Sequence, residues 1–188
     1  MKRLSFIMQY LLNPRTVGAI LPSSTKLSEK MVQSINFNKA KYIVEYGPGT
    51  GVFTDELIKQ RNKDTVLLII ENNNEFYNLL NNKFKGENHL FIINDSAENI
   101  EKYLKMYDIP YVDYVISGLP FASLPKNVSC MILNKTNKIL AKEGKFITFQ
   151  YTLFKKEFIS EYFKKIDVKR ELINIPPAYI LSCSNYIV

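Results

Sequence analysis

From residue 42 onward, short apolar runs rich in β-branched and aromatic residues alternate with stretches of helical periodicity. This alternation constrains the fold of the 188-residue chain more than any other feature. Repeated strand–helix units form a mostly parallel sheet that carries helices on both faces. The sequence therefore predicts an α/β fold, with strands at 42–46, 66–71, 89–93, 112–117 and 145–151 and helices at 52–60, 74–84, 97–106 and 129–140.

The two ends of the chain depart from this alternation. After a helix expected at 155–163, two extended runs at 168–175 and 179–188 are joined by a Pro-Pro pair that leaves no room for a helix. We expect them to form an antiparallel hairpin at one edge of the sheet. Residues 2–12 and 25–35 have the pattern of two helices. We therefore expect an N-terminal helical extension at 1–38, acting as a lid or membrane contact, and one main domain at 39–188.

Composition excludes several classes of protein. No apolar run approaches the roughly 18 residues of a membrane-spanning helix, and residues 4–12 are not followed by a signal-peptidase site. Cys130 and Cys183 cannot form a disulfide scaffold, and with the single His89 they provide no zinc site. The lone histidine also disfavours a Ser-His-Asp hydrolase. We expect a reduced, cytoplasmic protein that contains no metal.

The positive charge gathers at the amino end. Residues 1–30 hold five Lys or Arg against one Glu, whereas residues 61–110 hold six basic residues against eight acids. Such a bias suits a polyanion, either nucleic acid or anionic lipid, and does not choose between them. A solvated basic surface explains the charge equally well.

The strongest local signal is the stretch 45–51, Glu-Tyr-Gly-Pro-Gly-Thr-Gly, between the first expected strand and the next helix. Glycines at Gly47, Gly49 and Gly51 allow a tight turn and close approach to a ligand, and the helix offers its amino end. The stretch lacks the Gly-Lys-Ser/Thr ending of a P-loop and the dinucleotide spacing. By itself it indicates a nucleotide-type loop about as strongly as a structural turn.

Acidic residues follow the next two strands. Glu71 ends the second strand, where a carboxylate can accept hydrogen bonds from two ribose hydroxyls. Asp95 follows the third strand, where it can meet an adenine amino group. Each acid alone would be a helix cap or a surface charge, but together they describe one adenosine pocket at the carboxyl edge of the sheet.

With these residues the chain resembles the class I S-adenosylmethionine-dependent methyltransferases. The stretch 45–51 matches their first motif, and Glu71 and Asp95 match their second- and third-strand acids. The resemblance implies a Rossmann-like seven-stranded sheet and S-adenosyl-L-methionine as cofactor. It implies that the glycine loop holds the methionine portion, Glu71 the ribose, and Asp95 with its neighbours the adenine. The expected cofactor-binding residues are Val17, Gly18, Glu45, Gly47, Gly49, Thr50, Gly51, Glu71, Asn72, Asp95, Ser96 and Ala97.

The fourth expected strand ends in a candidate substrate motif. Methyltransferases that act on adenine amino groups have an Asn or Asp, two prolines and an aromatic residue here, and this chain keeps only Pro120 and Phe121. Ser117 and Leu119 therefore weaken a nucleobase assignment. The expected catalytic residues are Ser117, Gly118, Leu119, Pro120 and Phe121, with backbone carbonyls around Gly118 and Leu119 receiving the amine N–H groups.

Four stretches, 13–24, 45–54, 117–125 and 174–178, are similar to the bacterial phospholipid N-methyltransferases that resemble ribosomal RNA adenine dimethylases. This resemblance implies successive methylation of phosphatidylethanolamine by an enzyme bound peripherally to an anionic membrane surface. Residues 4–11 place apolar side chains on two sides of a helix, so one side could pack on the domain while the other enters a bilayer. A lid over the cofactor pocket is an equal alternative for that helix.

Three other functions stay open at this stage. RNA is the alternative substrate, in an adenine N6-methyltransferase of ribosomal RNA. A small-molecule amine methyltransferase has the same cofactor signature. A protein that binds the cofactor without catalysis, as a membrane-associated partner, is the last alternative.

Overall fold

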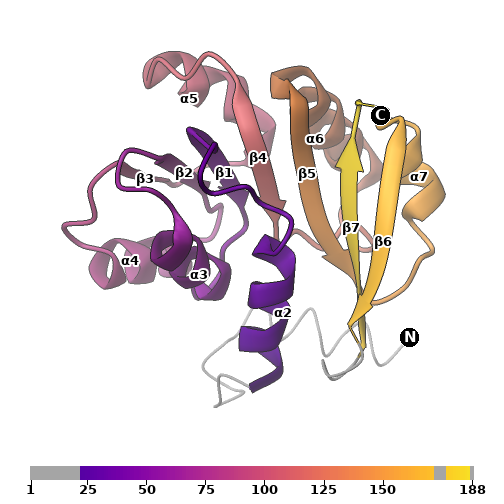
Figure 1. The fold of residues 1–188 in the computed structure, drawn as a ribbon, viewed down its shortest axis with the longest axis horizontal. Helices are drawn as coiled ribbons and strands as arrows, with labels where there is room; N and C mark the ends of the chain where they lie inside the picture. The colour runs from indigo at the N-terminus through magenta and orange to yellow at the C-terminus, as the bar shows by residue number, and fades with distance from the viewer. Residues whose placement is uncertain (1–21, 172–176, 187–188) are drawn as a thin grey trace.

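The computed structural model describes residues 22–171 and 177–186. They form a seven-stranded sheet in the order β3-β2-β1-β4-β5-β7-β6 (Figure 1). Strands β1 to β5 pair in parallel, whereas β7 runs antiparallel to both β5 and β6. The predicted mostly parallel sheet with an antiparallel hairpin at one edge is confirmed. The strands are β1 Tyr42–Tyr46, β2 Val66–Ile70, β3 Leu90–Ile93, β4 Val112–Ser117, β5 Leu140–Gln150, β6 Lys165–Glu171 and β7 Ala178–Ser184.

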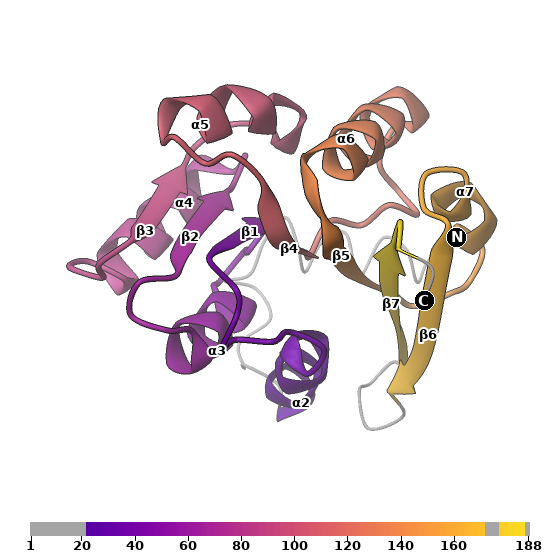
Figure 2. The same cartoon turned by 45° about the horizontal axis from the view of Figure 1, so that its top comes forward.

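Helices cover both faces of the sheet. Figure 2 shows α5, α6 and α7 on one face and α2 and α3 on the other. Consecutive strand residues are buried on opposite faces, and for this reason the central strands read as continuous apolar runs. The helices are α2 Pro22–Val32, α3 Val52–Gln60, α4 Asn74–Lys83, the 3-10 helix η2 Ala97–Asn99, α5 Ile100–Met106, α6 Lys126–Ile139 and α7 Lys156–Ser160.

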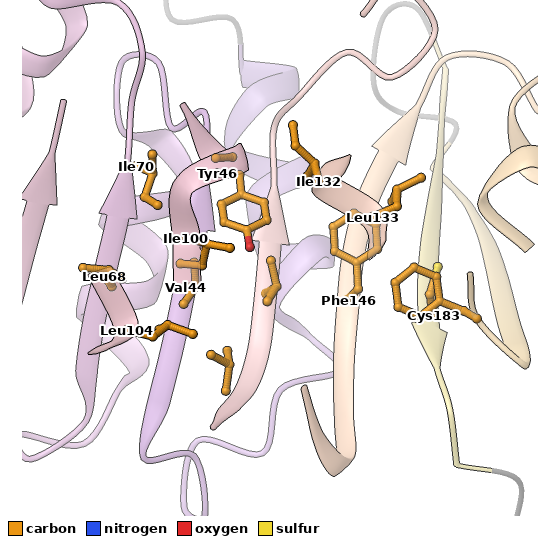
Figure 3. Packing of buried hydrophobic residues seen from close by; sticks show 14 of the residues in the cluster. Val44, Tyr46, Leu68, Ile70, Ile100, Leu104, Ile132, Leu133, Phe146 and Cys183 are labelled. Atoms are coloured by element: carbon orange, nitrogen blue, oxygen red, sulfur yellow. The ribbon is translucent and has the colours of Figure 1, made fainter. Parts of the chain in front are cut away.

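Two apolar clusters fill the spaces between these layers. The first joins the sheet to α5, α6 and α7, and Figure 3 shows several of its members, including Tyr46 and Phe146. The second joins the opposite face to α2 and α3, with Met31 and Leu57 fully buried. Because α2 belongs to this second cluster, it packs on the sheet. The proposed division between an extension at 1–38 and a domain at 39–188 stays a prediction.

Several element boundaries differ from the expected ones for local reasons. β3 begins after His89, whose φ of 54° interrupts the extended backbone. β5 begins at Leu140 directly after α6, and its pairing with β4 shifts between Val112 and Tyr114. The helix expected at 97–106 is divided into η2 and α5, and Ser96 caps η2 by accepting from the Glu98 N–H.

Some expectations fall on residues outside the described part of the chain. The helix expected at 2–12 and most of the link between the hairpin strands belong to this group. Within residues 22–171 and 177–186, no helix has the length and apolar character needed to cross a membrane. The same residues contain no group of three or more His, Cys, Asp or Glu arranged to hold a metal ion.

Candidate functional site

The candidate site lies where the strand order reverses. From β1 the chain moves outward to β2 and β3 and then returns to place β4 on the other side of β1. In open α/β sheets, ligands bind outside the carboxyl ends of the strands at such a reversal. The loops that follow β1 and β4 therefore define the region of interest.

The loop after β1 has the backbone conformation that its glycines allow. Gly47, Gly49 and Gly51 have φ values of 62°, 58° and 80°, in the left-handed region. The Gly47 N–H donates to the Ile70 carbonyl at 2.9 Å, which ties the loop to the end of β2. Among the described residues, nothing apart from the chain neighbours of Gly49 lies within 4 Å of the position that a Cβ would take there. The loop thus presents bare backbone that no described side chain covers at Gly49, as close approach by a ligand requires.

The loops after β1 and β4 touch each other. The Gly118 N–H donates to the Tyr46 carbonyl at 2.9 Å. A Cβ at Gly118 would lie 2.6 Å from the Gly47 carbonyl oxygen, and a Cβ at Gly47 would lie 2.7 Å from Leu119 Cδ2. A larger residue at Gly118 would clash with backbone and force the loops apart, whereas one at Gly47 would displace the Leu119 side chain. The structure therefore brings the expected cofactor loop and the expected substrate motif into direct contact.

Glu71 holds the glycine loop in place. Its Oε2 accepts from the Gly49 N–H at 3.1 Å, and its Oε1 accepts from the Asn73 N–H at 2.8 Å. Burial raises the pKa of Glu71, while these hydrogen bonds and one from the Asn72 backbone act in the opposite direction. A carboxylate offers about four lone-pair sites, so these bonds leave capacity for ribose hydroxyls.

Asp95 lies at the carboxyl end of β3 with three donors already in place. Its Oδ2 accepts from the Tyr103 hydroxyl at 2.5 Å, and its Oδ1 accepts from the Ser96 N–H at 2.7 Å and from Asn99 Nδ2 at 2.9 Å. The Tyr103 hydrogen bond is the main reason that the pKa of Asp95 is lowered. Sequence reasoning missed Tyr103, although it follows Asp95 by two helical turns. Ala97, also expected at the cofactor, is buried in the first core cluster.

Glu45 is fully buried at the end of β1, just before the glycine loop. Its Oε2 accepts from the Thr54 hydroxyl at 2.7 Å, whereas its Oε1 has no hydrogen-bond partner among the described residues. Burial raises the pKa of Glu45 to about 8, although the Thr54 hydrogen bond acts in the opposite direction. The strand that leads into the glycine loop therefore carries a buried carboxyl group whose second oxygen receives no hydrogen bond from any described residue.

Lys83 is a second residue that sequence reasoning missed. From the end of α4 its Nζ lies 2.5 Å from the Asp55 carboxylate and donates to the Thr50 carbonyl at 3.3 Å. Leu80 on α4 and Phe84, which caps the end of that helix, lie against Gly51. The sequence places Lys83 in an Asn-rich helix that carries no signal of its own, so only the fold reveals this support of the glycine loop.

The substrate motif after β4 combines buried side chains with exposed backbone. Ser117 is fully buried, and its hydroxyl accepts from the Leu119 N–H at 3.2 Å. Phe121 is also fully buried, with its ring edge-on to Phe146 at 6.0 Å between centroids. The Leu119 carbonyl accepts from the Phe121 N–H, and the Pro120 carbonyl accepts from two later N–H groups. No described residue donates to the Gly118 carbonyl.

These features fit the cofactor that the resemblance implies. S-adenosylmethionine carries a sulfonium, an amino-acid group and an adenosine. The carboxyls of Glu45, Glu71 and Asp95 lie at the ends of three neighbouring strands, β1 to β3, and no described side chain fills the space beside Gly49. The role of each residue toward the cofactor stays a prediction. Val17 and Gly18 lie outside the described residues.

Comparison with known proteins identifies relatives of two kinds. An ornithine lipid N-methyltransferase from Singulisphaera acidiphila is 26% identical over 95% of this chain and 93% of its own length. A ribosomal RNA small subunit methyltransferase A from Mycoplasma capricolum subsp. capricolum is 31% identical over 53% of this chain. That match spans only 36% of the Mycoplasma protein.

The fold and the sequence agree on the class of protein. The crystal structure of a SAM-dependent methyltransferase from Aquifex aeolicus matches with a TM-score of 0.64 and 15% identity, over 86% of this chain and 92% of that one. The family model described as ribosomal RNA adenine dimethylase matches residues 2–186. The chain therefore belongs to the ribosomal RNA adenine dimethylase family and is an S-adenosylmethionine-dependent methyltransferase.

Proposed function

We propose that this enzyme methylates the amino group of a membrane lipid head group, with phosphatidylethanolamine as the first candidate substrate. The length of the matches carries this proposal. The lipid N-methyltransferase matches along 95% of this chain and 93% of its own, whereas the ribosomal RNA enzyme matches along 36% of its own length. Since both relatives are methyltransferases, this difference in matched length favours a lipid amine over ribosomal RNA as the methyl acceptor.

The loop after β4 supports an aliphatic amine as acceptor. Gly118 has no side chain to recognise a base edge, and no described residue donates to its carbonyl. That carbonyl can accept an N–H of a neutral amine. A primary ammonium has a pKa near that of Lys, about 10.4, and must lose a proton before it can attack. The Leu119 side chain, packed on Gly47, makes this region apolar and so disfavours the ammonium form.

Positioning is the main contribution that the chain itself makes to the reaction. When bound, S-adenosylmethionine supplies an activated methyl group for an in-line displacement. The contact between the Gly47 and Gly118 loops sets the distance between the cofactor loop and the acceptor loop. Alignment of reactants can account for roughly 7 to 11 kcal/mol of a barrier. In this proposal the buried Ser117 and Phe121 keep the acceptor loop in shape, and the Gly118 backbone holds the amine.

The membrane setting rests on the basic amino end. Lys2, Arg3 and Arg15 belong to residues outside the described part, so an interfacial anchor at 2–12 is proposed from sequence alone. A membrane-bound position would bring a lipid head group to the carboxyl edge of the sheet. We therefore propose that the enzyme is cytoplasmic and associates peripherally with the membrane.

Methylation of ribosomal RNA adenine is the second candidate function. The family match over residues 2–186 and the Mycoplasma relative favour it. Against it stands the loop after β4, which keeps only Pro120 and Phe121 of the motif that adenine methyltransferases use and has Ser117 and Leu119 beside them.

Lipid analysis of an expressing host tests the proposal. The chain is expressed in bacteria whose membranes contain phosphatidylethanolamine but no methylated derivatives, and lipid extracts are examined by mass spectrometry. We expect mono-, di- or trimethylated ethanolamine lipids with the wild-type chain. Gly49→Val, which places a strained β-branched residue at a φ of 58°, should yield none. Unmodified lipids beside increased adenine methylation in ribosomal RNA would favour the second candidate.

A further inference from the structure

One loop beside the candidate site has no role in the mechanism above. Strand β5 lies parallel to β4, and Thr148 is level with Ser117. The segment 151–155, named here the Phe154 loop, therefore leaves the sheet at the same carboxyl edge as the acceptor loop. Figure 1 shows β4 and β5 pointing in the same direction, with the connection to α7 beyond the end of β5.

The Phe154 loop exposes two adjacent apolar side chains. Phe154 is 80% exposed, more than any other large hydrophobic residue in the described part of the chain, and Leu153 is 38% exposed. Single exposed apolar residues are normal on protein surfaces. An adjacent pair at the rim of a candidate active site is the kind of feature that marks an interaction surface.

Basic residues lie in and beside the Phe154 loop. Lys155 Nζ lies 5.9 Å from the Phe154 ring centroid and 5.3 Å from that of Phe158, and Lys156 is exposed beside it. On β6, the Arg170 guanidinium lies 5.7 Å from the ring centroid of Tyr179, which is level with the end of β5. Residues 151–156 contain no acid, and the exposed Glu157 follows them directly. The surface thus combines an apolar tip with positive charge.

We infer that the Phe154 loop docks the enzyme on an anionic lipid surface. Phe154 and Leu153 enter the boundary between head groups and acyl chains, while Lys155, Lys156 and Arg170 face lipid phosphates. This inference rests on the proposed lipid substrate and adds an orientation to it. With this loop in the membrane, the carboxyl edge of the sheet faces the head groups that carry the amine.

Lipid fits this surface better than RNA does. An exposed phenylalanine flanked by lysines could stack on an unpaired base. Leu153 has no aromatic face for stacking on a base. Moving its aliphatic side chain from water into hydrocarbon is favourable in free energy. The adjacent pair therefore favours a hydrocarbon boundary.

A single tryptophan can report the position of the loop, because the chain contains no Trp. Phe154→Trp is mixed with vesicles of phosphatidylglycerol and phosphatidylcholine, which lack an amine substrate. We expect a blue shift in emission and quenching by brominated acyl chains. Met106→Trp is the matched control, since Met106 is 59% exposed at the end of α5, before the amino end of β4. An unshifted Phe154→Trp spectrum, or one that changes with RNA alone, would overturn the inference.

Binding of vesicles gives a second measurement. Phe154→Ser should weaken vesicle binding roughly tenfold. Lys155→Gln and Lys156→Gln together should weaken vesicle binding roughly fivefold per residue, and this loss should be smaller at high salt. These exposed substitutions should leave the fold and S-adenosylmethionine binding unchanged, as circular dichroism and calorimetry can check. Wild-type vesicle binding by Phe154→Ser would contradict the docking role.

Short-chain phosphatidylethanolamine in detergent micelles separates the two proposals. The docking variants should methylate this substrate at the wild-type rate, because no bilayer is needed. If Phe154→Ser methylates micellar lipid and also binds vesicles as well as wild type does, the docking inference is refuted and the proposed function stands. Insertion of the loop without methylation of any lipid amine refutes the proposed function alone.

Discussion

Replacing Glu45 by Gln tests whether the carboxyl at the end of β1 is held in its neutral form. Burial raises the pKa of Glu45 from the ordinary 4.5 to about 8. Between these values the unfolded chain carries an ionised glutamate, while the folded chain keeps the proton. Folding stability therefore falls as pH rises across this window.

The size of the effect follows from the pKa change. One pKa unit corresponds to about 1.4 kcal/mol, so a rise from 4.5 to about 8 corresponds to on the order of 5 kcal/mol of stability lost. Glutamine has the shape of the protonated carboxyl and does not titrate. Its carbonyl can accept from the Thr54 hydroxyl as Oε2 does, and its amide replaces the unpartnered oxygen.

Urea unfolding of both proteins between pH 5 and pH 8 measures this difference. We expect the Gln variant to gain several kcal/mol relative to wild type as the pH rises, because other titrating groups cancel in the comparison. Glu143→Gln, at an exposed position of β5, should follow the wild-type curve. Parallel curves for wild type and Glu45→Gln would refute the reasoning.

Three further substitutions test the contacts of the site. Gly118→Ala places a Cβ 2.6 Å from a carbonyl oxygen of the loop after β1, so kcat/KM should fall roughly 100-fold in steady-state assays. Lys83→Met removes the bond to the Thr50 carbonyl, and calorimetry should show severalfold weaker S-adenosylmethionine binding. Tyr103→Phe removes the strongest bond to Asp95, so the pKa of that carboxyl should rise in an NMR titration.

Each of these results has an outcome that would count against the structure. Full activity in Gly118→Ala would mean that the two loops are not in contact during turnover. Unchanged cofactor affinity in Lys83→Met would remove its role as a support of the glycine loop. An unmoved Asp95 titration in Tyr103→Phe would show that the hydrogen bond at 2.5 Å does not stabilise the carboxylate.

The sheet could be predicted because its central strands are buried on both faces. β1 and β4 have the expected boundaries, since each is a short apolar run between clear turn signals. β5 could not be delimited from sequence. Its first residues, Leu140 to Gly144, lie where the pairing with β4 shifts, and a Cβ at Gly144 would lie 2.9 Å from the Ala141 carbonyl oxygen. The start of β5 therefore depends on its pairing with β4, which is distant in the sequence.

The candidate site could be predicted in part. The glycine loop has a local signature, because left-handed backbone at three positions demands glycine. The contact between Gly118 and the loop after β1 depends on the order of strands, and spacing along the chain does not reveal it. The same holds for Lys83, which reaches the loop from a helix without any motif. Phe121, expected among the catalytic residues, has its ring buried in the first core cluster, and its role in catalysis stays a prediction.

Competition between two acceptors tests the central claim most directly. Purified enzyme is incubated with methyl-labelled S-adenosylmethionine, phosphatidylethanolamine vesicles and small-subunit ribosomal RNA in one reaction, and the label in each fraction is measured. A parallel reaction replaces phosphatidylethanolamine by ornithine lipid. We predict label on the lipid amine and none on RNA. Label on RNA adenine, with none in either lipid, would contradict it.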